Sequence, residues 1–201
     1  MSMHSYTTVQ EVRRIKPIPD APASLYESVV EVATEAIDDI CGRRFDSDVD
    51  TRDFEVELDY LSGRYASMDI DDIVPGSDTP VQVELLSDPE ADGTVQTEGW
   101  WLAPRTPKVG WPHTELTVRS QYQWEGRMVR ITAEFGWPAV PAVVSRACLM
   151  LAARILEREN SILGLQTNNE FGTQIVPARF DPDTARLLRD YKKHRLIGRW
   201  E

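Results

Sequence analysis

Three aspartates that lie close together are the residues best suited to chemistry in this chain. Asp69, Asp71 and Asp72 stand in a stretch with strand-like alternation, so Asp69 and Asp71 are expected on one face of a strand. Two carboxylates on one face can hold a divalent cation, as in metal-dependent nucleases. Charged side chains on a solvated strand edge also prevent unwanted pairing, and we favour this structural interpretation. A nuclease is therefore the weakest of three functional hypotheses.

The remaining reactive residue types form no recognisable catalytic pattern. His4, His113 and His194 lie far apart without a second ligand at helical spacing, so no zinc site is predicted. Cys41 and Cys148 each fall on the apolar face of a predicted helix, which indicates buried free thiols. The sequence has no glycine-rich phosphate loop, serine nucleophile elbow, Cys-x-x-Cys or His-Glu-x-x-His. We therefore expect neither an enzyme nor a bound cofactor or metal.

Tryptophans give the second functional hypothesis. Five of the six lie within a β-rich region or at its exit: Trp100, Trp101, Trp111, Trp124 and Trp137. Aromatic rings in a small β domain can stack on sugars or bases, which suggests a Trp-rich carbohydrate-binding module for host recognition. Burial in the core is the favoured interpretation because tryptophan buries a large area. Trp111, in the loop 108–113, is the one most expected to be exposed.

Capping residues and apolar periodicity predict the N-terminal helices. Thr8 and Glu11 have capping-box spacing at the start of a short helix. A longer helix is predicted from Ser24, with Glu27 completing a second capping box, to Cys41. Gly42 is its expected C′ residue.

The strongest helix signal begins after Gly136, Trp137 and Pro138. Apolar residues recur at three- and four-residue steps from Val140 to Leu156, and the first turn is placed near Pro141. Between the two long helices, two-residue alternation predicts strands over 52–58, 68–74, 81–86, 99–102, 115–123 and 128–135. The last two are predicted to pair as a hairpin through a turn at 123–127.

The C-terminal end is predicted to be a loop, a helix and a tail. Residues 161–176 show no sustained period. Asp181 and Pro182 suit the N-cap and first position of a final helix. The tail 192–201 sets Leu196, Ile197 and Trp200 among basic residues, which suits a docking peptide.

Composition and charge indicate a folded, acidic protein. The chain has 41% hydrophobic and 27% charged residues, and its formal net charge is −11. Residues 20–98 contain 22 acidic and 4 basic side chains, a net charge of −18, whereas residues 179–201 carry a net +3. An acidic surface repels phosphates and would let DNA pass without sticking, although the acid can also serve solubility alone. No membrane span or secretory signal is predicted.

Several segments in this order resemble the head–tail adaptor (connector, head completion) proteins of long-tailed bacteriophages. The segments are Ala36 to Phe45, Phe135 to Pro141, Ala147 to Arg154, Asp181 to Asp183, Leu187-Leu188 and Tyr191. With the periodicity, the resemblance implies an α+β fold. Its helical bundle core would consist of the long N-terminal helix, the long helix after Trp137-Pro138 and the C-terminal helix. A barrel- or sandwich-like β-rich insertion would separate the first two long helices. The expected domains are 1–45 with 136–193 as the helical core, 46–135 as the insertion and 194–201 as a docking tail.

The resemblance also implies a role. Such adaptors form a ring, expected here to have twelve copies, beneath the portal protein and join the capsid to a stopper or tail-terminator protein. Genomic DNA passes through the lumen without sequence-specific binding. The expected location is the virion neck, with assembly in the bacterial host cytoplasm. In these adaptors the C-terminal segment engages the portal, which points to His194, Arg195, Leu196, Ile197, Gly198, Arg199 and Trp200. The residues expected to have structural roles are Gly42, Arg43, Phe45, Gly136, Trp137, Pro138 and Pro141.

Overall fold

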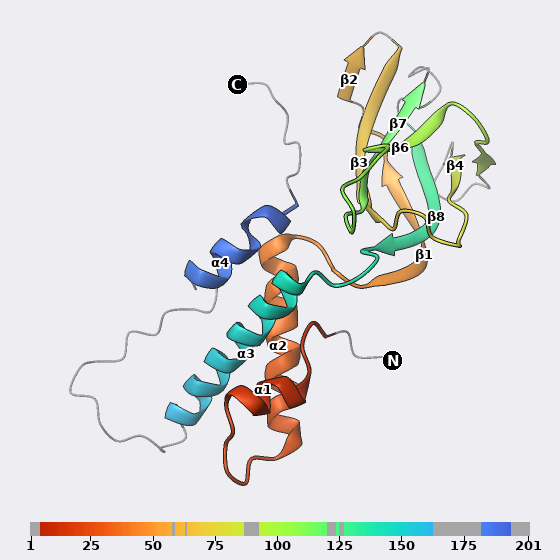
Figure 1. Cartoon of the computed structure of the whole chain (residues 1–201). Coiled ribbons are helices and arrows are strands. Elements are labelled where there is room, and N and C mark those ends of the chain that lie inside the picture. Colours follow the sequence, from red (N-terminus) through yellow and green to blue (C-terminus); the bar gives the residue numbers. More distant parts are fainter. Residues whose placement is uncertain are drawn as a thin grey trace. The chain divides into compact units, whose positions relative to one another are not determined.

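The computed structural model forms two compact units (Figure 1). It describes residues 5–57, 59–62, 64–86, 93–119, 124, 127–162 and 182–193. The helical unit comprises Met1–Phe45 and Val140–Lys193, and the sheet unit contains Asp46–Ala139. The chain therefore passes between the units twice, after Phe45 and after Ala139.

The helical unit contains α1 (Val9–Ile15), α2 (Ala23–Cys41), α3 (Ala142–Ile162), α4 (Pro182–Leu188) and a 3-10 turn (Arg189–Tyr191). Thr8 caps α1 and forms the predicted capping box with Glu11, which is confirmed. Gly42 ends α2 in the left-handed conformation at φ +62°, and its N–H donates to the Asp38 carbonyl 2.7 Å away. The predicted start of α2 is wrong, because Pro22 is the N-cap and makes no side-chain cap. Proline at this point ends the extended linker, so Ser24 is already inside the first turn.

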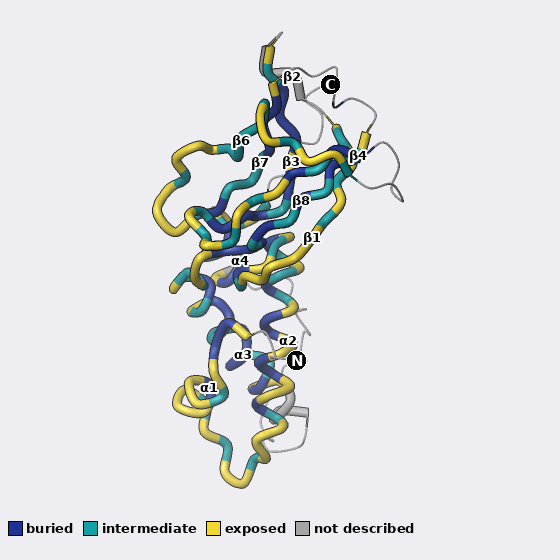
Figure 2. Tube along the Cα trace, turned by 90° about the vertical axis from the view of Figure 1, so that its right-hand side faces the viewer, coloured by how far each residue is buried: buried dark blue, intermediate teal, exposed yellow. Residues whose placement is uncertain are grey.

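The long helices α2 and α3 pack against each other through their apolar faces (Figures 1 and 2). Buried residues at helical spacing form these faces: Tyr26, Val29, Val30, Ala33, Thr34, Ile37 and Cys41 on α2, and Val144, Ala147, Cys148, Leu151, Ala152 and Leu156 on α3. Burying one such aliphatic side chain contributes about 1.5–3 kcal/mol, so this contact is a main source of stability.

The sheet unit is one antiparallel sheet. Its strands are β1 (Ser47–Glu55), β2 (Asp59–Ser62), β3 (Tyr65–Ile73), β4 (Gln82–Leu86), β5 (Thr94–Val95), β6 (Trp100–Ala103), β7 (His113–Arg119) and β8 (Met128–Gly136). Their order is β5-β4-β8-β3-β7-β6, with β1 paired to β8 and β2 to β3. All nine residues of β1 pair with β8, from Ser47 opposite Gly136 to Glu55 opposite Met128.

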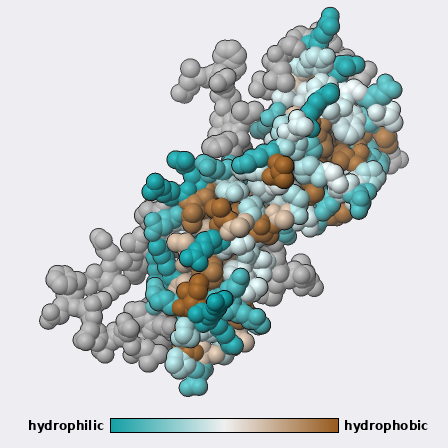
Figure 3. Space-filling view, viewed as in Figure 1, coloured by the Kyte–Doolittle hydropathy of each residue, from teal (hydrophilic) through white to brown (hydrophobic). Residues whose placement is uncertain are grey.

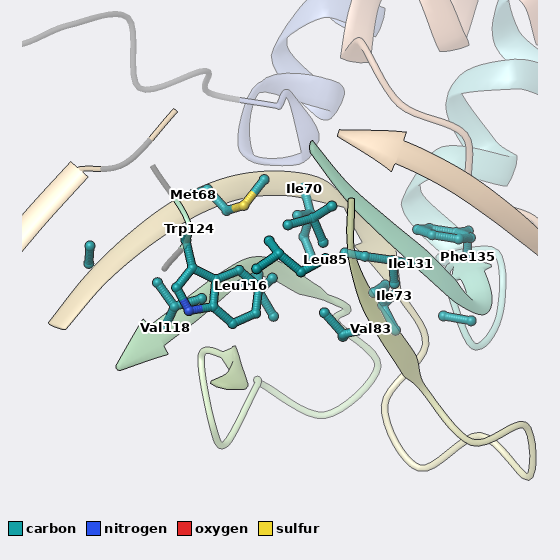
Figure 4. Close-up of a cluster of buried hydrophobic side chains, with 13 residues drawn as sticks. Met68, Ile70, Ile73, Val83, Leu85, Leu116, Val118, Trp124, Ile131 and Phe135 are labelled. Atoms are coloured by element: carbon teal, nitrogen blue, oxygen red, sulfur yellow. The ribbon is translucent and has the colours of Figure 1, made fainter. Parts of the chain in front are cut away.

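Apolar side chains gather on the inner face of this curled sheet (Figure 4). Trp124 is 2% exposed and packs in the same cluster as Met68, Leu116 and Val118. Along β8 the odd-numbered residues Val129, Ile131, Ala133 and Phe135 are buried, and the even-numbered residues from Met128 to Glu134 are partly exposed. This alternation is the period-two pattern of a strand with one buried face.

The predicted hairpin between 115–123 and 128–135 is wrong. Within the described residues, β7 pairs with β3 and β6, whereas β8 pairs with β1, β4 and β3. Each of the six predicted strands overlaps an observed one, although β1 begins five residues earlier than predicted, and β2 and β5 were not predicted. The partners of β8 are distant in sequence, and local alternation carries no information about which distant strand pairs with which.

The predicted fold class is wrong as well. The described residues form a curled antiparallel sheet of eight strands with four helices, two of them only seven residues long, rather than a helical bundle with an inserted barrel or sandwich. The C-terminal helix α4 has seven residues, as does α1, so neither can run along α2 and α3 as a bundle member. Helical periodicity is a strong local signal and led us to place too much of the architecture in the helices.

Candidate assembly surfaces

The root of the predicted docking tail is fixed to the end of α2. The Lys193 N–H donates to the Cys41 carbonyl over 2.7 Å, which satisfies one of the last carbonyls of the helix. Gly42 lies beside Lys193, since a Cβ at Gly42 would stand 3.9 Å from the Cβ of Lys193. The tail residues 194–200 themselves lie outside the described residues. The structure thus shows where the tail begins and leaves its proposed docking role untested.

Phe45 is the buried residue that ends the helical unit's first segment. It is 0% exposed and makes edge contacts with the rings of Tyr6 and Tyr191, at centroid distances of 5.6 and 6.0 Å. Its N–H donates to the Tyr6 hydroxyl over 2.8 Å, and that hydroxyl donates to the carboxylate of Asp38. Arg43, two residues before Phe45, is half-buried. Sequence reasoning missed Tyr6 because nothing local to it indicates a partner at the end of α2.

At the other crossing, Gly136 and Trp137 are held against Asp46. Gly136 has φ +117°, and a Cβ there would lie 1.8 Å from the Asp46 carbonyl oxygen. The Trp137 N–H donates to the same carbonyl over 3.2 Å. Pro138 is exposed, and the Pro141 carbonyl accepts from the N–H groups of the first turn of α3. Only glycine fits the close backbone approach at 136.

Trp137 is also tied to Asp72. Its indole Nε1–H donates to Asp72 Oδ2 over 2.8 Å, and both side chains are buried. The ring of Trp111 lies 5.1 Å from the Trp137 ring, and Lys108 stands over Trp111 at 5.2 Å. Asp72 therefore serves a structural hydrogen bond in the sheet unit.

The three aspartates of the nuclease hypothesis have different surroundings. Asp69 is exposed and stands opposite Glu115 in the register of β3 and β7, whereas Asp71 accepts a hydrogen bond from Arg52 Nη1 over 3.0 Å. Asp72 is buried at Trp137. Within the described part of the chain, no group of three or more His, Cys, Asp or Glu residues could hold a metal ion. The structure gives the nuclease hypothesis no support.

Strand β1 is exposed along most of its length (Figure 2) and carries several acidic side chains. Most of its residues are exposed, including Asp48, Asp50, Asp53 and Glu55. Arg52 lies over the Phe135 ring at 4.3 Å and forms ion pairs with Asp48, Asp50 and Asp71. Hydrogen bonds from Arg52 and from the Thr51 N–H lower the pKa of Asp50, so its charge persists at mildly acidic pH. Charges of this kind keep an edge strand from pairing indiscriminately.

The tryptophans do not form one exposed platform. Trp124 and Trp137 are buried, and Trp100, Trp101 and Trp111 are half-buried. The Trp100 indole donates to the Gln96 carbonyl over 2.6 Å, and Trp101 contacts Tyr65 and Arg105. Of the rings that sequence analysis grouped together, Trp111 and Trp137 therefore contact each other, and Trp100 and Trp101 make other contacts within the sheet unit.

The structure describes one of the three histidines and both cysteines. The ring Nδ1 of His113 lies 2.8 Å from the Pro104 carbonyl oxygen, and His4 and His194 lie outside the described residues. Cys41 and Cys148 are buried free thiols, as predicted. Burial raises the pKa of each to about 11. Searching the described helices for a membrane-spanning segment finds none.

Comparison with solved structures gives a likeness to a neck protein. The fold is similar to that of a chain in a solved structure described as the neck of an empty GTA particle computed with C6 symmetry. The TM-score is 0.52, the sequence identity is 18%, and the match covers 94% of this chain and 91% of that one. At this identity the likeness concerns the fold. No protein-family model and no curated protein sequence matches the chain.

Proposed function

We propose that this chain is a structural protein of the neck of a phage or phage-like particle. In this role it joins the capsid portal to the tail as a head–tail adaptor, and no enzymatic step is involved. The observation that carries the proposal is the fold likeness to a chain from the neck of a GTA particle, which extends over nearly the whole of both chains. Both units of the fold are thus included in the match.

A ring of copies beneath the portal is the arrangement that we propose in detail. The related neck structure was computed with C6 symmetry, which supports a cyclic assembly here. Twelve copies, docking on the portal through residues 194–200 and meeting a stopper or tail-terminator protein on the other side, follow the adaptor resemblance. The proposed location is the virion, after assembly in the host cytoplasm.

Charge supports passage of DNA through such a ring. The formal charge of the chain is −11, and the described edge strand β1 carries four exposed acidic side chains. Negative surfaces raise the energy of nearby phosphates, so DNA would pass without being held. The basic tail, with Arg195 and Arg199, has the opposite sign and suits attachment to an acidic partner surface.

Mass photometry of the purified chain, with and without the portal ring from the same particle, tests the proposal. A mass gain of about a dozen copies on the portal is expected from the adaptor resemblance. The absence of any gain at both low and physiological salt would contradict portal docking. The same histogram shows whether the ring exists before the portal is added.

Two variants of the tail test which segment docks. Neutralising Arg195 and Arg199 to glutamine should weaken portal binding and reduce its salt dependence, since fewer ion pairs form. The matched control neutralises Arg186 and Arg189, two exposed arginines on and just after α4. Deleting Leu196 to Glu201 should reduce docking further. Normal docking by that truncated chain would show that the tail is not the anchor.

A further inference from the structure

Helix α2 carries a row of carboxylates on its outer face. Glu27, Glu31, Glu35 and Asp39 follow one another at four-residue steps, and all four are exposed. They lie on the side of the helix away from its buried face. Among the described residues none of them forms an ion pair. Like charges at this spacing repel each other, so the row destabilises an isolated helix unless a partner neutralises it.

Helix α3 carries a row of the opposite sign at the same spacing. Arg146, Met150, Arg154 and Arg158 follow one another at four-residue steps, with Arg146 and Arg158 exposed and the other two half-buried. Arg154 also donates to Asp183 on α4, with Nη2 and Oδ2 3.3 Å apart. Arg146 and Arg158 form no ion pair within the described part of the chain. The charges of Arg146 and Arg158 are therefore available for a partner, whereas Arg154 is engaged with α4.

The two rows match in length and differ in sign. Each spans three four-residue steps, which is about 18 Å of α-helix. Among the described residues no ion pair joins the two rows, so they do not neutralise each other within one copy. Val32, which is 48% exposed beside the carboxylates, and Met150 beside the arginines add apolar area to each row. The face seen in Figure 3 carries hydrophobic patches among hydrophilic residues.

We propose that the carboxylate row of α2 in one copy docks on the arginine row of α3 in the next copy. Such a contact joins two different patches and is therefore heterologous, which closes into a ring when the rotation between copies is right. This inference rests on the proposed function, which supplies the ring. It adds the surfaces through which neighbouring copies meet. The partner is a second copy of this chain because the complementary row is present in every copy.

Charge reversal of each row, followed by mixing, tests the contact. The first variant is Glu31→Arg with Glu35→Arg, and the second is Arg146→Glu with Arg158→Glu. Arg154 is left unchanged because it contacts Asp183. Self-association of each chain is measured by sedimentation velocity at low ionic strength and high micromolar concentration, and circular dichroism checks that each variant is folded. The wild type should associate, and each variant alone should do so with a dissociation constant raised on the order of tenfold or more.

Mixing the two variants in equal amounts should restore association, because copies can then alternate with opposite charges at every contact. The matched controls reverse exposed charges of the sheet unit: Glu57→Arg with Glu98→Arg, and Arg119→Glu with Arg127→Glu. These should associate like the wild type. A wild type that stays monomeric, a reversed row that associates normally, or a mixture that does not recover would each overturn the proposal. The portal is absent from this experiment, so its failure and the failure of portal docking are separate results.

Discussion

Asp53 on β1 stands directly opposite Arg130 on β8, and the two side chains form a bidentate ion pair. Arg130 Nε lies 2.7 Å from Asp53 Oδ1, and Nη2 lies 2.9 Å from Oδ2. Each side chain is about one third exposed, at 33% and 30%. The paired geometry makes this contact stronger than an ordinary surface ion pair. It ties the acidic edge strand to a central strand of the sheet.

Replacing Arg130 with methionine should lower the free energy of unfolding by about 0.5–1 kcal/mol at neutral pH. The Arg130 guanidinium lowers the pKa of Asp53. The pair therefore stabilises the fold fully above the pKa of the unfolded carboxyl, about 4, and its contribution is lost as pH falls through the lower folded value. Urea unfolding of the wild type and variant at neutral and strongly acidic pH should show the difference shrinking. Arg119→Met is the matched exposed control, and a difference of equal size at both pH values would contradict this account.

Replacing Gly136 with alanine should be strongly destabilising, by more than about 3 kcal/mol. The residue has φ +117°, and the added Cβ would lie 1.8 Å from the Asp46 carbonyl oxygen. Gly110→Ala is the matched control, because Gly110 also has positive φ, at +79°, but nothing lies within 4 Å of its Cβ position. The control substitution should lower the free energy of unfolding by only the backbone strain, about 1–2 kcal/mol. Equal losses of urea stability in the two variants would show that close packing at Gly136 is unimportant.

The sequence predicts the local elements better than their arrangement. Thr8 and Gly42 mark helix ends because capping depends on one residue and its near neighbours. Strand β8 is predicted from its alternation of apolar and polar residues, and the structure shows the matching alternation of burial. Its pairing with β1 joins residues as distant as Ser47 and Gly136, which no local pattern reveals. The fold class was wrong for this reason, since it depended on how the strands assemble.

The surfaces proposed to join neighbouring copies can also be predicted only in part from the sequence. Glu27 to Asp39 and Arg146 to Arg158 are visible as four-residue spacings in the printed sequence. The structure adds that the four carboxylates, Arg146 and Arg158 are exposed. The hydrogen bond from Trp137 to Asp72 joins residues on β3 and after β8, and is decided by tertiary packing. Sequence reasoning placed Asp72 with a cation-binding group because it considered neighbours in the chain rather than in space.

Replacing Trp137 with phenylalanine should destabilise the sheet unit by about 2–4 kcal/mol. The smaller ring leaves a gap beside Trp111, and it removes the Nε1–H that Asp72 accepts over 2.8 Å in a buried site. Asp72→Asn keeps an acceptor oxygen at the same place and should therefore lower the free energy of unfolding less than Trp137→Phe. Urea unfolding followed by circular dichroism measures both. If Trp137→Phe cost no more than Asp72→Asn, the indole donor would have little importance for stability.

The two thiols should be unreactive in the native protein and react only on unfolding. Cys41 and Cys148 are 1% and 0% exposed, and burial raises the pKa of each to about 11, so little thiolate is present at pH 8. A chromogenic disulfide reagent should titrate both cysteines in denaturant and neither without it. The unfolded thiols ionise near pH 8.5, below the folded values, so the wild type should lose stability relative to the Cys41→Ala, Cys148→Ala variant as pH rises from about 9 to 11. Rapid labelling of the native chain, or a stability difference that does not change over this pH range, would show that the thiols are accessible.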